Sequence, residues 1–518
     1  MSTVTGGKQP SGLPAPARGF ILAIDQGTTN TKAILLDPAT GEVMASGARP
    51  VGISFPASGW VEQDAEELWL ATLGAVDDCL ATGAVPVGIA ISNQRESVVA
   101  WSRRTGAALG PVLGWQDART AAACVSLATE RPDADELVRT RTGLSLDPMF
   151  SAPKMRWLLD TTLAAGADRD DIRLGTVDAW LIHKLTGEHA TDVGNASRTL
   201  LLALESLRWD PELLDLFGIP AGALPEIRDS DAGFGSTRGV PGLPDGIPVV
   251  AVLADSHAAL YQHGCTRPGT GKATYGTGSS VMTPCAAPTA APAGIATTVA
   301  WVAGGEPTYA REGNIIASGS ALDWMARTLG APAGTSGGAF LTALAAETPD
   351  AGGVALVPAF SGLGAPYWDR AAAGLITGIT AGTTAAHLAR AALEAVAHQV
   401  ADVVEAIDSG GGAAIDRLHA DGGATASGLL MQLQADLLGR PLHVADVPEA
   451  SALGAATLAA RTLGLPVAAP PQGAVVVPAE AGRADRRDAW SRAVARSRGR
   501  DVSSPPSTRT ATDLEGEA

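Results

Sequence analysis

The stretch "ILAIDQGTTNTKAILLD", residues 21–37, constrains the fold more than any other part of the chain. Its two apolar runs are typical of buried strands, and an aspartate follows each of them. The polar turn between the runs can point backbone N–H groups and hydroxyls into one concavity, which suits a phosphate. Lys32 adds a positive charge there, and Asp25 is placed to hold Mg²⁺ through water. A plain hairpin turn explains the stretch equally well when it is taken alone.

Strand and helix patterns alternate along the chain, which predicts an α/β protein. The run "VPVGIAIS" reads as a strand after the helical pattern "AEELWLATLGAVDDCLA", and "LHVADV" reads as a strand before the helical pattern "ASALGAATLAARTLG". The longest predicted helix is "TAAHLARAALEAVAHQVADVVEAI". A second polar turn occurs about 400 residues after the first, in "LHADGGATASGLL", where Ser427 is placed to cap a helix. Two similar turns so far apart predict two related halves.

The length of 518 residues predicts more than one domain. We expect a disordered tail over 1–18, a first domain over 19–258, a second over 259–500 and a disordered tail over 501–518, because both ends are polar and lack periodicity.

Composition narrows the classes of partner. A net charge of −17 argues against nucleic acid and against anionic membranes, since both need a basic face. No apolar run reaches the roughly 18 residues of a membrane helix. The four cysteines form no CxxC pair, so neither a zinc site nor a disulfide framework is indicated and a cytoplasmic location is expected. Small metabolites remain as the expected ligands.

Further polar turns follow predicted strands. In "TYGTGSS", Thr277 stands between two glycines that let the backbone approach a phosphate. The nearby string "RPGTGKAT" is not a P-loop, because Ala273 follows Lys272 where a hydroxyl is required. Arg95 and Glu96 follow a strand, where α/β proteins place ligand-binding groups, although adjacent opposite charges are more often a solvated surface pair. Asp255 also follows a strand, and its alternative role is a helix cap.

Together these stretches resemble the FGGY family of carbohydrate kinases, and within it the glycerol kinases most closely. The likeness runs from about residue 20 to 465 and is carried by "DQGTTNTKAI", "GWVEQDAEELW", "ISNQRES", "GWQDART", "FSAPKMRWLLD", "GTVDAWLIHKLTGEHATDVGNASRT", "TYGTGSS", "VPAFSGLGAPYWD" and "DGGATASGLLMQLQADLLG". The resemblance implies two actin-like (ribonuclease H-like) ATPase domains with the active site in the cleft between them.

The resemblance also implies ATP and Mg²⁺ as cofactors, with Asp25 organising the metal. The residues that it places around the nucleotide are Thr28, Thr29, Asn30, Lys32, Thr277, Gly319, Asp323, Gly423 and Ser427.

For the substrate, the resemblance implies phosphorylation of a polyol or ketose hydroxyl, with Asp255 as the general base. The residues that it places around the substrate are Arg95, Glu96, Trp115, Met149, Asp255, Ser256 and Ser280. Glycerol kinases carry tyrosine, glutamine and phenylalanine where this chain has Met149, Ser256 and Ser280. The two serines enlarge the predicted pocket and offer free hydroxyls, so we expect a four- or five-carbon polyol or ketose in place of glycerol.

Three alternatives stay open at this point. The chain is a glycerol kinase proper, an actin-like ATPase switch without a sugar substrate, or a homologue that has lost activity and acts as a regulator. The polyol-contacting set argues against the switch, because a switch has no need for it. The resemblance also allows a homodimer or a homotetramer.

Overall fold

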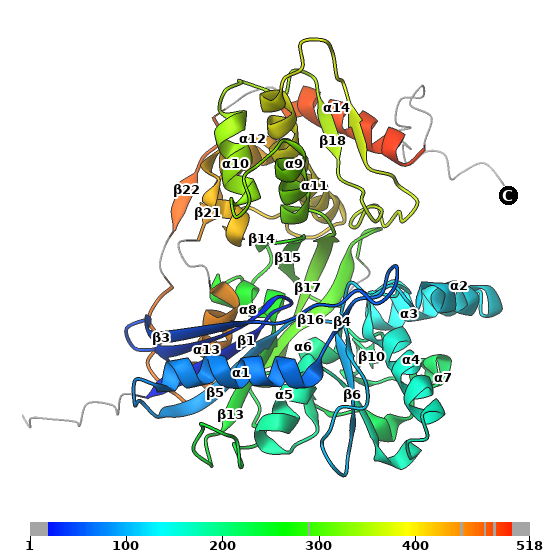
Figure 1. Ribbon diagram of the computed structural model, residues 1–518, viewed down its shortest axis with the longest axis vertical. Helices are drawn as coiled ribbons and strands as arrows, with labels where there is room; N and C mark the ends of the chain where they lie inside the picture. Colours follow the sequence, from blue (N-terminus) through cyan, green and yellow to red (C-terminus); the bar gives the residue numbers. More distant parts are fainter. Residues whose placement is uncertain (1–18, 289–290, 446–448, 471–472, 480–482, 500–518) are drawn as a thin grey trace, which may run out of the picture.

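The computed structural model describes residues 19–288, 291–445, 449–470, 473–479 and 483–499. The predicted tails, 1–18 and 501–518, therefore lie outside the described residues. The chain forms two lobes, each built on one mixed β-sheet with helices on its faces (Figure 1). This is the predicted α/β class.

The first sheet has the strand order β13-β5-β1-β2-β3. Its strands are β1 (Phe20–Gln26), β2 (Asn30–Asp37), β3 (Glu42–Pro50), β5 (Pro86–Asn93) and β13 (Val249–Ala254). β1 and β2 form the antiparallel hairpin that the opening stretch predicts, with Asp25 opposite Lys32. β5 and β13 add on in parallel, so β1, β5 and β13 all end at the same edge of the sheet.

The second sheet has the order β16-β17-β15-β14-β20-β21-β22. Its strands are β14 (Thr270–Tyr275), β15 (Ser279–Cys285), β16 (Ala296–Ala303), β17 (Glu306–Ile315), β20 (Arg417–Asp421), β21 (Leu442–Val444) and β22 (Ala474–Val476). The run β17-β15-β14-β20-β21 has two antiparallel and then two parallel pairings, as β3-β2-β1-β5-β13 does. The predicted relation between the two halves is confirmed by this repeated order.

Helices cover both faces of the first sheet. α1 (Ala65–Leu80) and α5 (Val177–Thr186) pack on one face, and α8 (Asp255–Gln262) and α13 (Ala450–Thr462) pack on the other. α13 comes from the second half of the sequence, yet it lies beside α8 in the lower lobe (Figure 1). Both α1 and α13 form where their apolar periodicity predicts them.

The second sheet has its apolar core on one face. The helices there are α9 (Gly319–Thr328), α10 (Gly337–Ala345), α11 (Ala385–Ser409), α12 (Gly428–Leu438) and α14 (Arg483–Ser497). α11 is the predicted longest helix and is buried over most of its length.

A further layer adjoins the first sheet, where α4 (Ser151–Ala164) packs on β6 (Val98–Ser102) and β8 (Ile172–Thr176).

In the part of the chain that the structure describes, no helix is both long enough and apolar enough to cross a bilayer. All four cysteines are free thiols.

Candidate active site

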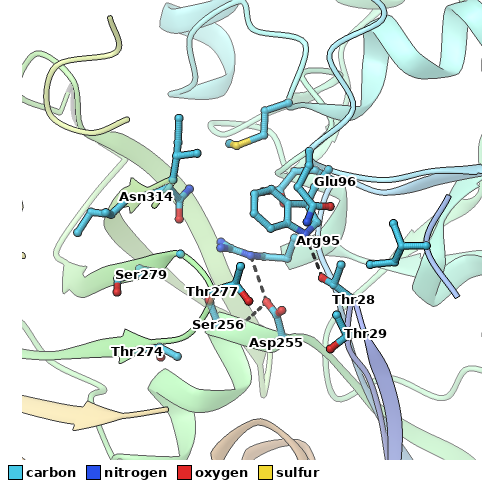
Figure 2. A pocket seen from close by; sticks show the side chains of 18 of the residues that line it. Thr28, Thr29, Arg95, Glu96, Asp255, Ser256, Thr274, Thr277, Ser279 and Asn314 are labelled. Carbon is cyan, nitrogen blue, oxygen red and sulfur yellow. Dashed lines mark hydrogen bonds and ion pairs between the residues drawn. The ribbon is translucent and has the colours of Figure 1, made fainter. Parts of the chain in front are cut away.

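A cavity of about 450 Å³ lies between the two halves, at the edge where β1, β5 and β13 end (Figure 2). The first half contributes the turn after β1, the loop after β5 and the start of α8. The second half contributes the turn between β14 and β15 and the end of β17. All the residues that the sequence places around the substrate line this cavity: Arg95, Glu96, Trp115, Met149, Asp255, Ser256 and Ser280. Thr28, Thr29 and Thr277 line it as well.

Positive and negative side chains alternate in a connected series of ion pairs beside this cavity. Arg95 Nε lies 3.3 Å from Asp255 Oδ1, and Arg95 Nη1 lies 2.6 Å from Glu312 Oε1. Arg198 continues the series, with Nη1 2.9 Å from Glu312 Oε2 and Nε 2.7 Å from Glu96 Oε1. We call these five residues the charge ladder. Arg95 and Glu96 are only 8% and 4% exposed, so the interpretation as a surface pair is wrong.

Glu312 and Arg198 were missed by the sequence analysis. Both are buried, Glu312 on β17 and Arg198 just after α6 (Val193–Ala196). Arg198 stands inside one of the motifs that carry the family resemblance, and Glu312 is one of three charged residues in β17, beside Arg311. Neither signal alone says which charges the two residues face.

Burial and the ladder set the protonation of its carboxylates. Burial raises the pKa of Asp255, while the nearby Arg95 guanidinium opposes that rise. Burial also acts to raise the pKa of Glu312, but Arg198 and Arg95 outweigh it and hold that pKa well below its usual range. Glu312 is therefore a fixed negative charge, whereas Asp255 is closer to accepting a proton.

Asp255 does not cap a helix through its side chain. α8 begins at Asp255 itself, and its N-cap residue Ala254 makes no side-chain cap. Asp255 Oδ1 accepts a hydrogen bond of 2.6 Å from the backbone N–H of Ser256, and the carboxyl group faces the cavity (Figure 2). The alternative cap role is therefore wrong.

Two hydrogen bonds fix the backbone on the substrate side of the cavity, one at the loop after β5 and one at the turn after β1. Glu96 has φ of 60°, in the left-handed region that non-glycine residues rarely adopt. Ser151 Oγ donates to the Glu96 carbonyl at 3.1 Å and so supports this strained conformation. Trp115 Nε1 donates to Thr28 Oγ1 at 3.0 Å, which ties the substrate side of the cavity to the turn after β1.

A second cavity of about 610 Å³ adjoins the first and shares Thr277 with it. It is lined by the remaining residues of the predicted nucleotide set in the second half: Gly319, Asp323, Gly423 and Ser427. A Cβ atom on Gly319 would lie 2.6 Å from the carbonyl oxygen of Gly276, so only glycine fits there. Ser427 Oγ accepts from the Leu430 N–H at 3.2 Å, which confirms the predicted helix cap.

Three predicted residues of the first turn do not line either cavity. Asn30 is exposed and donates to Thr29 Oγ1, while Asp25 and Lys32 face each other across the hairpin. Asp25 Oδ1 is buried and has no hydrogen-bond partner among the described residues. Burial and the negative charge of Asp255 raise the pKa of Asp25 to about 6. A cation at this point would relieve both effects.

Comparisons with known proteins agree with this arrangement. The N-terminal domain model of the FGGY family of carbohydrate kinases matches residues 20–261, and the C-terminal domain model matches 271–463. A glycerol kinase of Citrifermentans bemidjiense is 46% identical over 450 residues, covering 85% of this chain and 89% of the relative. An apulose kinase of Pectobacterium atrosepticum is 46% identical over 452 residues, covering 86% and 90%.

Solved structures match as well. The Plasmodium falciparum glycerol kinase with ADP has a TM-score of 0.83 at 28% identity, covering 93% of this chain and 98% of that one. A xylulose kinase from Rhodospirillum rubrum has a TM-score of 0.80 at 30% identity, covering 91% and 97%.

Proposed function

Since the chain belongs to the FGGY family of carbohydrate kinases, we propose that it transfers the γ-phosphoryl group of ATP to a hydroxyl of glycerol. One observation carries the proposal. A carboxylate with a raised pKa, Asp255, lies in the same cavity as Thr28, Thr29 and Thr277 of the two predicted phosphate turns. A base for the hydroxyl proton and donors for the phosphates are thus within one site.

Glycerol is better supported than the four- or five-carbon substrate that the sequence departures suggest. Relatives 42% to 46% identical are named glycerol kinase, and one equally similar relative is named apulose kinase. The cavity also weakens the argument for a larger substrate. Ser280 Oγ donates to Glu312 Oε1 at 3.0 Å, so this hydroxyl is already engaged. Apolar surface in the cavity is supplied by Met149, Ile316 and Trp368. The absence of a phenylalanine at position 280 therefore does not leave the substrate without an apolar wall.

The chemistry follows from the charge ladder. Asp255 accepts the proton of the attacking hydroxyl, and its raised pKa favours that transfer. Arg95 and Glu96 hold the neighbouring hydroxyls, and because their other sides are fixed by Glu312 and Arg198 they do not reorganise during the reaction. Closure of one lobe on the other keeps water from the phosphoryl group.

ATP occupies both cavities in this proposal. Its phosphates lie at Thr28, Thr29 and Thr277, with Lys32 adding positive charge nearby, and its nucleoside part lies in the second cavity along Gly319, Asp323, Gly423 and Ser427. Asp25 fits a Mg²⁺ ion, because its buried Oδ1 lacks a partner in the described structure. Bound Mg²⁺ would neutralise charge on the phosphates.

The test is ADP release by the purified protein with Mg²⁺ and ATP. Glycerol is compared with tetritols, pentitols and pentuloses, and with a control that lacks any polyol. The proposal predicts the highest kcat/KM for glycerol. A higher kcat/KM for a five-carbon ketose would support the four- or five-carbon substrate instead. Equal rates of ADP release in every sample, including the control, would indicate an ATPase switch.

A further inference from the structure

A third cavity, of about 360 Å³, lies on the opposite side of the second sheet from its apolar core. Among the described residues it shares no lining residue with either of the other two cavities. Its distinctive groups are the side chains of His263, Arg267, Arg417, His419 and His443, and we call it the histidine cavity. Three of the eight histidines of the chain thus meet at one place.

Strand pairing builds one wall of this cavity. His419 on β20 lies opposite Lys272 on β14 and opposite His443 on β21, so the three side chains share one face of the sheet. Arg417 lies on the same face, two residues before His419. The residues that alternate with them on these strands, such as Ala273, Leu418 and Leu442, belong to the apolar core on the other face.

The imidazole rings form a stack. The centroids of His263 and His419 are 5.1 Å apart with planes at 20°, and those of His419 and His443 are 5.3 Å apart with planes at 32°. Burial, followed by the neighbouring His263, lowers the pKa of His419 to about 3, so that ring is neutral near pH 7. A neutral imidazole still carries one N–H donor. In the part of the chain described, no cluster of histidine, cysteine or carboxylate side chains has the arrangement of a metal site.

The two arginines of the cavity are exposed. In the part of the chain that the structure describes, neither guanidinium makes a hydrogen bond or an ion pair. Arg95 and Arg198, by contrast, each pair with Glu312. Two guanidinium groups without a described partner, beside a stack of imidazoles, form a concave set of donors that suits an anion.

We propose that the histidine cavity binds the phosphate group of a small molecule. Guanidinium groups match the oxygens of phosphate in pairs, and imidazole N–H groups supply further donors. The volume accommodates inorganic phosphate or a phosphate ester of a small metabolite. This proposal does not rest on the proposed glycerol kinase reaction, since no residue assigned to that reaction lines the histidine cavity.

A path connects the histidine cavity with the other two cavities. His263 Nε2 lies 2.5 Å from Asp421 Oδ2, and Asp421 is followed in sequence by Gly422 and by Gly423 of the second cavity. Thr274, which lines the first cavity, lies opposite Asp421 and accepts from Lys272 Nζ at 2.8 Å. An anion that draws the His263 side chain toward itself weakens the contact between His263 and Asp421. Because Asp421 precedes Gly423 of the second cavity, anion binding then changes the affinity of that cavity for nucleotide.

Calorimetry tests the site directly. Inorganic phosphate is titrated into the full-length protein, with a non-hydrolysable ATP analogue already filling the first two cavities. The Arg267→Gln/Arg417→Gln double variant is expected to bind phosphate at least about tenfold more weakly, because two charge-assisted hydrogen-bond donors to the anion are lost. The matched control is Arg139→Gln/Arg492→Gln, which removes the same charge from exposed positions on α3 (Ala134–Thr142) and α14.

The outcomes decide the proposal. Equal binding by parent and double variant, or no binding by the parent, overturns it. Glucose 6-phosphate is titrated in a second arm: binding of both probes assigns the site to phosphate esters, and binding of inorganic phosphate alone assigns it to free phosphate. If the double variant fails to fold, histidine NMR signals of the parent serve instead, because phosphate must shift those of His419 and His443. A His263→Gln variant is expected to bind phosphate more weakly and to lose the effect of phosphate on ADP affinity, because His263 both lines the cavity and contacts Asp421.

Discussion

In the proposed reaction Asp255 accepts a proton beside Arg95, and two opposing effects set the pKa of Asp255. Burial favours the protonated form that proton transfer produces, while the guanidinium stabilises the carboxylate before transfer. Burial is the larger effect, so the pKa of Asp255 is raised, in the direction that favours a general base.

Replacing Asp255 with asparagine tests this role. The change is nearly isosteric and removes the proton acceptor, so kcat on glycerol is expected to fall by about 10²- to 10⁴-fold. The affinity for ADP, measured by calorimetry, is expected to stay within about twofold, because Asp255 lines the first cavity only. Turnover at the parent rate would show that another group accepts the proton.

Glu312 is the member of the charge ladder on which two arginines depend. A Glu312→Gln variant leaves Arg95 and Arg198 buried without their shared carboxylate, so the free energy of unfolding is expected to fall by about 3 to 5 kcal/mol. Urea denaturation measures this loss. Glu212→Gln is the matched control, since the exposed pair of Glu212 with Arg141 should contribute at most about 1 kcal/mol.

The same comparison has a dependence on pH. The folded protein holds the pKa of Glu312 below its unfolded value of about 4.3, so this stabilisation is present above that pH and is lost as pH falls toward the folded pKa. The difference between parent and Glu312→Gln should therefore be constant from pH 8 to 6 and shrink below about pH 4. A difference that grows on acidification would contradict the assignment.

Among the elements, helix α1 shows how local sequence sets an element boundary. Asp64 precedes α1, and its Oδ1 accepts from the N–H groups of Glu66 at 2.8 Å and Glu67 at 2.9 Å. Asp64→Ala removes both bonds and is expected to lower the free energy of unfolding by about 1 kcal/mol. Asp64→Asn keeps an acceptor and should change it by only a few tenths of that amount, measured in the same urea titration. Equal losses in both variants would mean that charge, and not the cap, stabilises the helix.

Such local signals account for what the sequence could predict. The hairpin of β1 and β2, helix α1, helix α13 and the cap at Ser427 each depend on residues within a few positions of one another. The charge ladder depends on contacts between residues more than 100 positions apart, and the stack of His263, His419 and His443 depends on strand pairing. The family motifs predicted the residues around the substrate. They did not show that the Ser280 hydroxyl already donates a hydrogen bond to Glu312.

For the protein as a whole, an ion pair outside the charge ladder also joins the two halves beside the first cavity. Arg370 Nη2 lies 2.7 Å from Asp147 Oδ1, and the nearby Trp368 and Met149 line the cavity. Each partner thus stands two residues from the cavity wall, on opposite halves of the sequence. We expect this pair to favour the arrangement in which the proposed substrate is enclosed between the lobes.

Arg370→Gln should therefore raise KM for glycerol by about two- to fivefold, the effect of an ion pair of at most about 1 kcal/mol, while kcat is unchanged or higher. In the parent, added salt should raise KM toward the value of the variant, because the pair is partly exposed. Arg156→Gln is the control, since it breaks a pair with Asp160 within α4 whose arginine is as exposed as Arg370. Equal KM values for parent and Arg370→Gln would show that the pair plays no part in closure.

The position of α13 also determines the order in which the first lobe can be completed on the ribosome. One face of the first sheet, including Ile21, Ile34 and Leu253, packs against Leu453 and Leu458 of α13. The last strand of that sheet ends at Ala254, whereas α13 ends at Thr462. At about 5 to 20 residues per second, roughly 10 to 40 s of translation separate the two. During that interval the apolar face lacks one of its covering helices, and the slower the elongation, the longer this surface is open to aggregation.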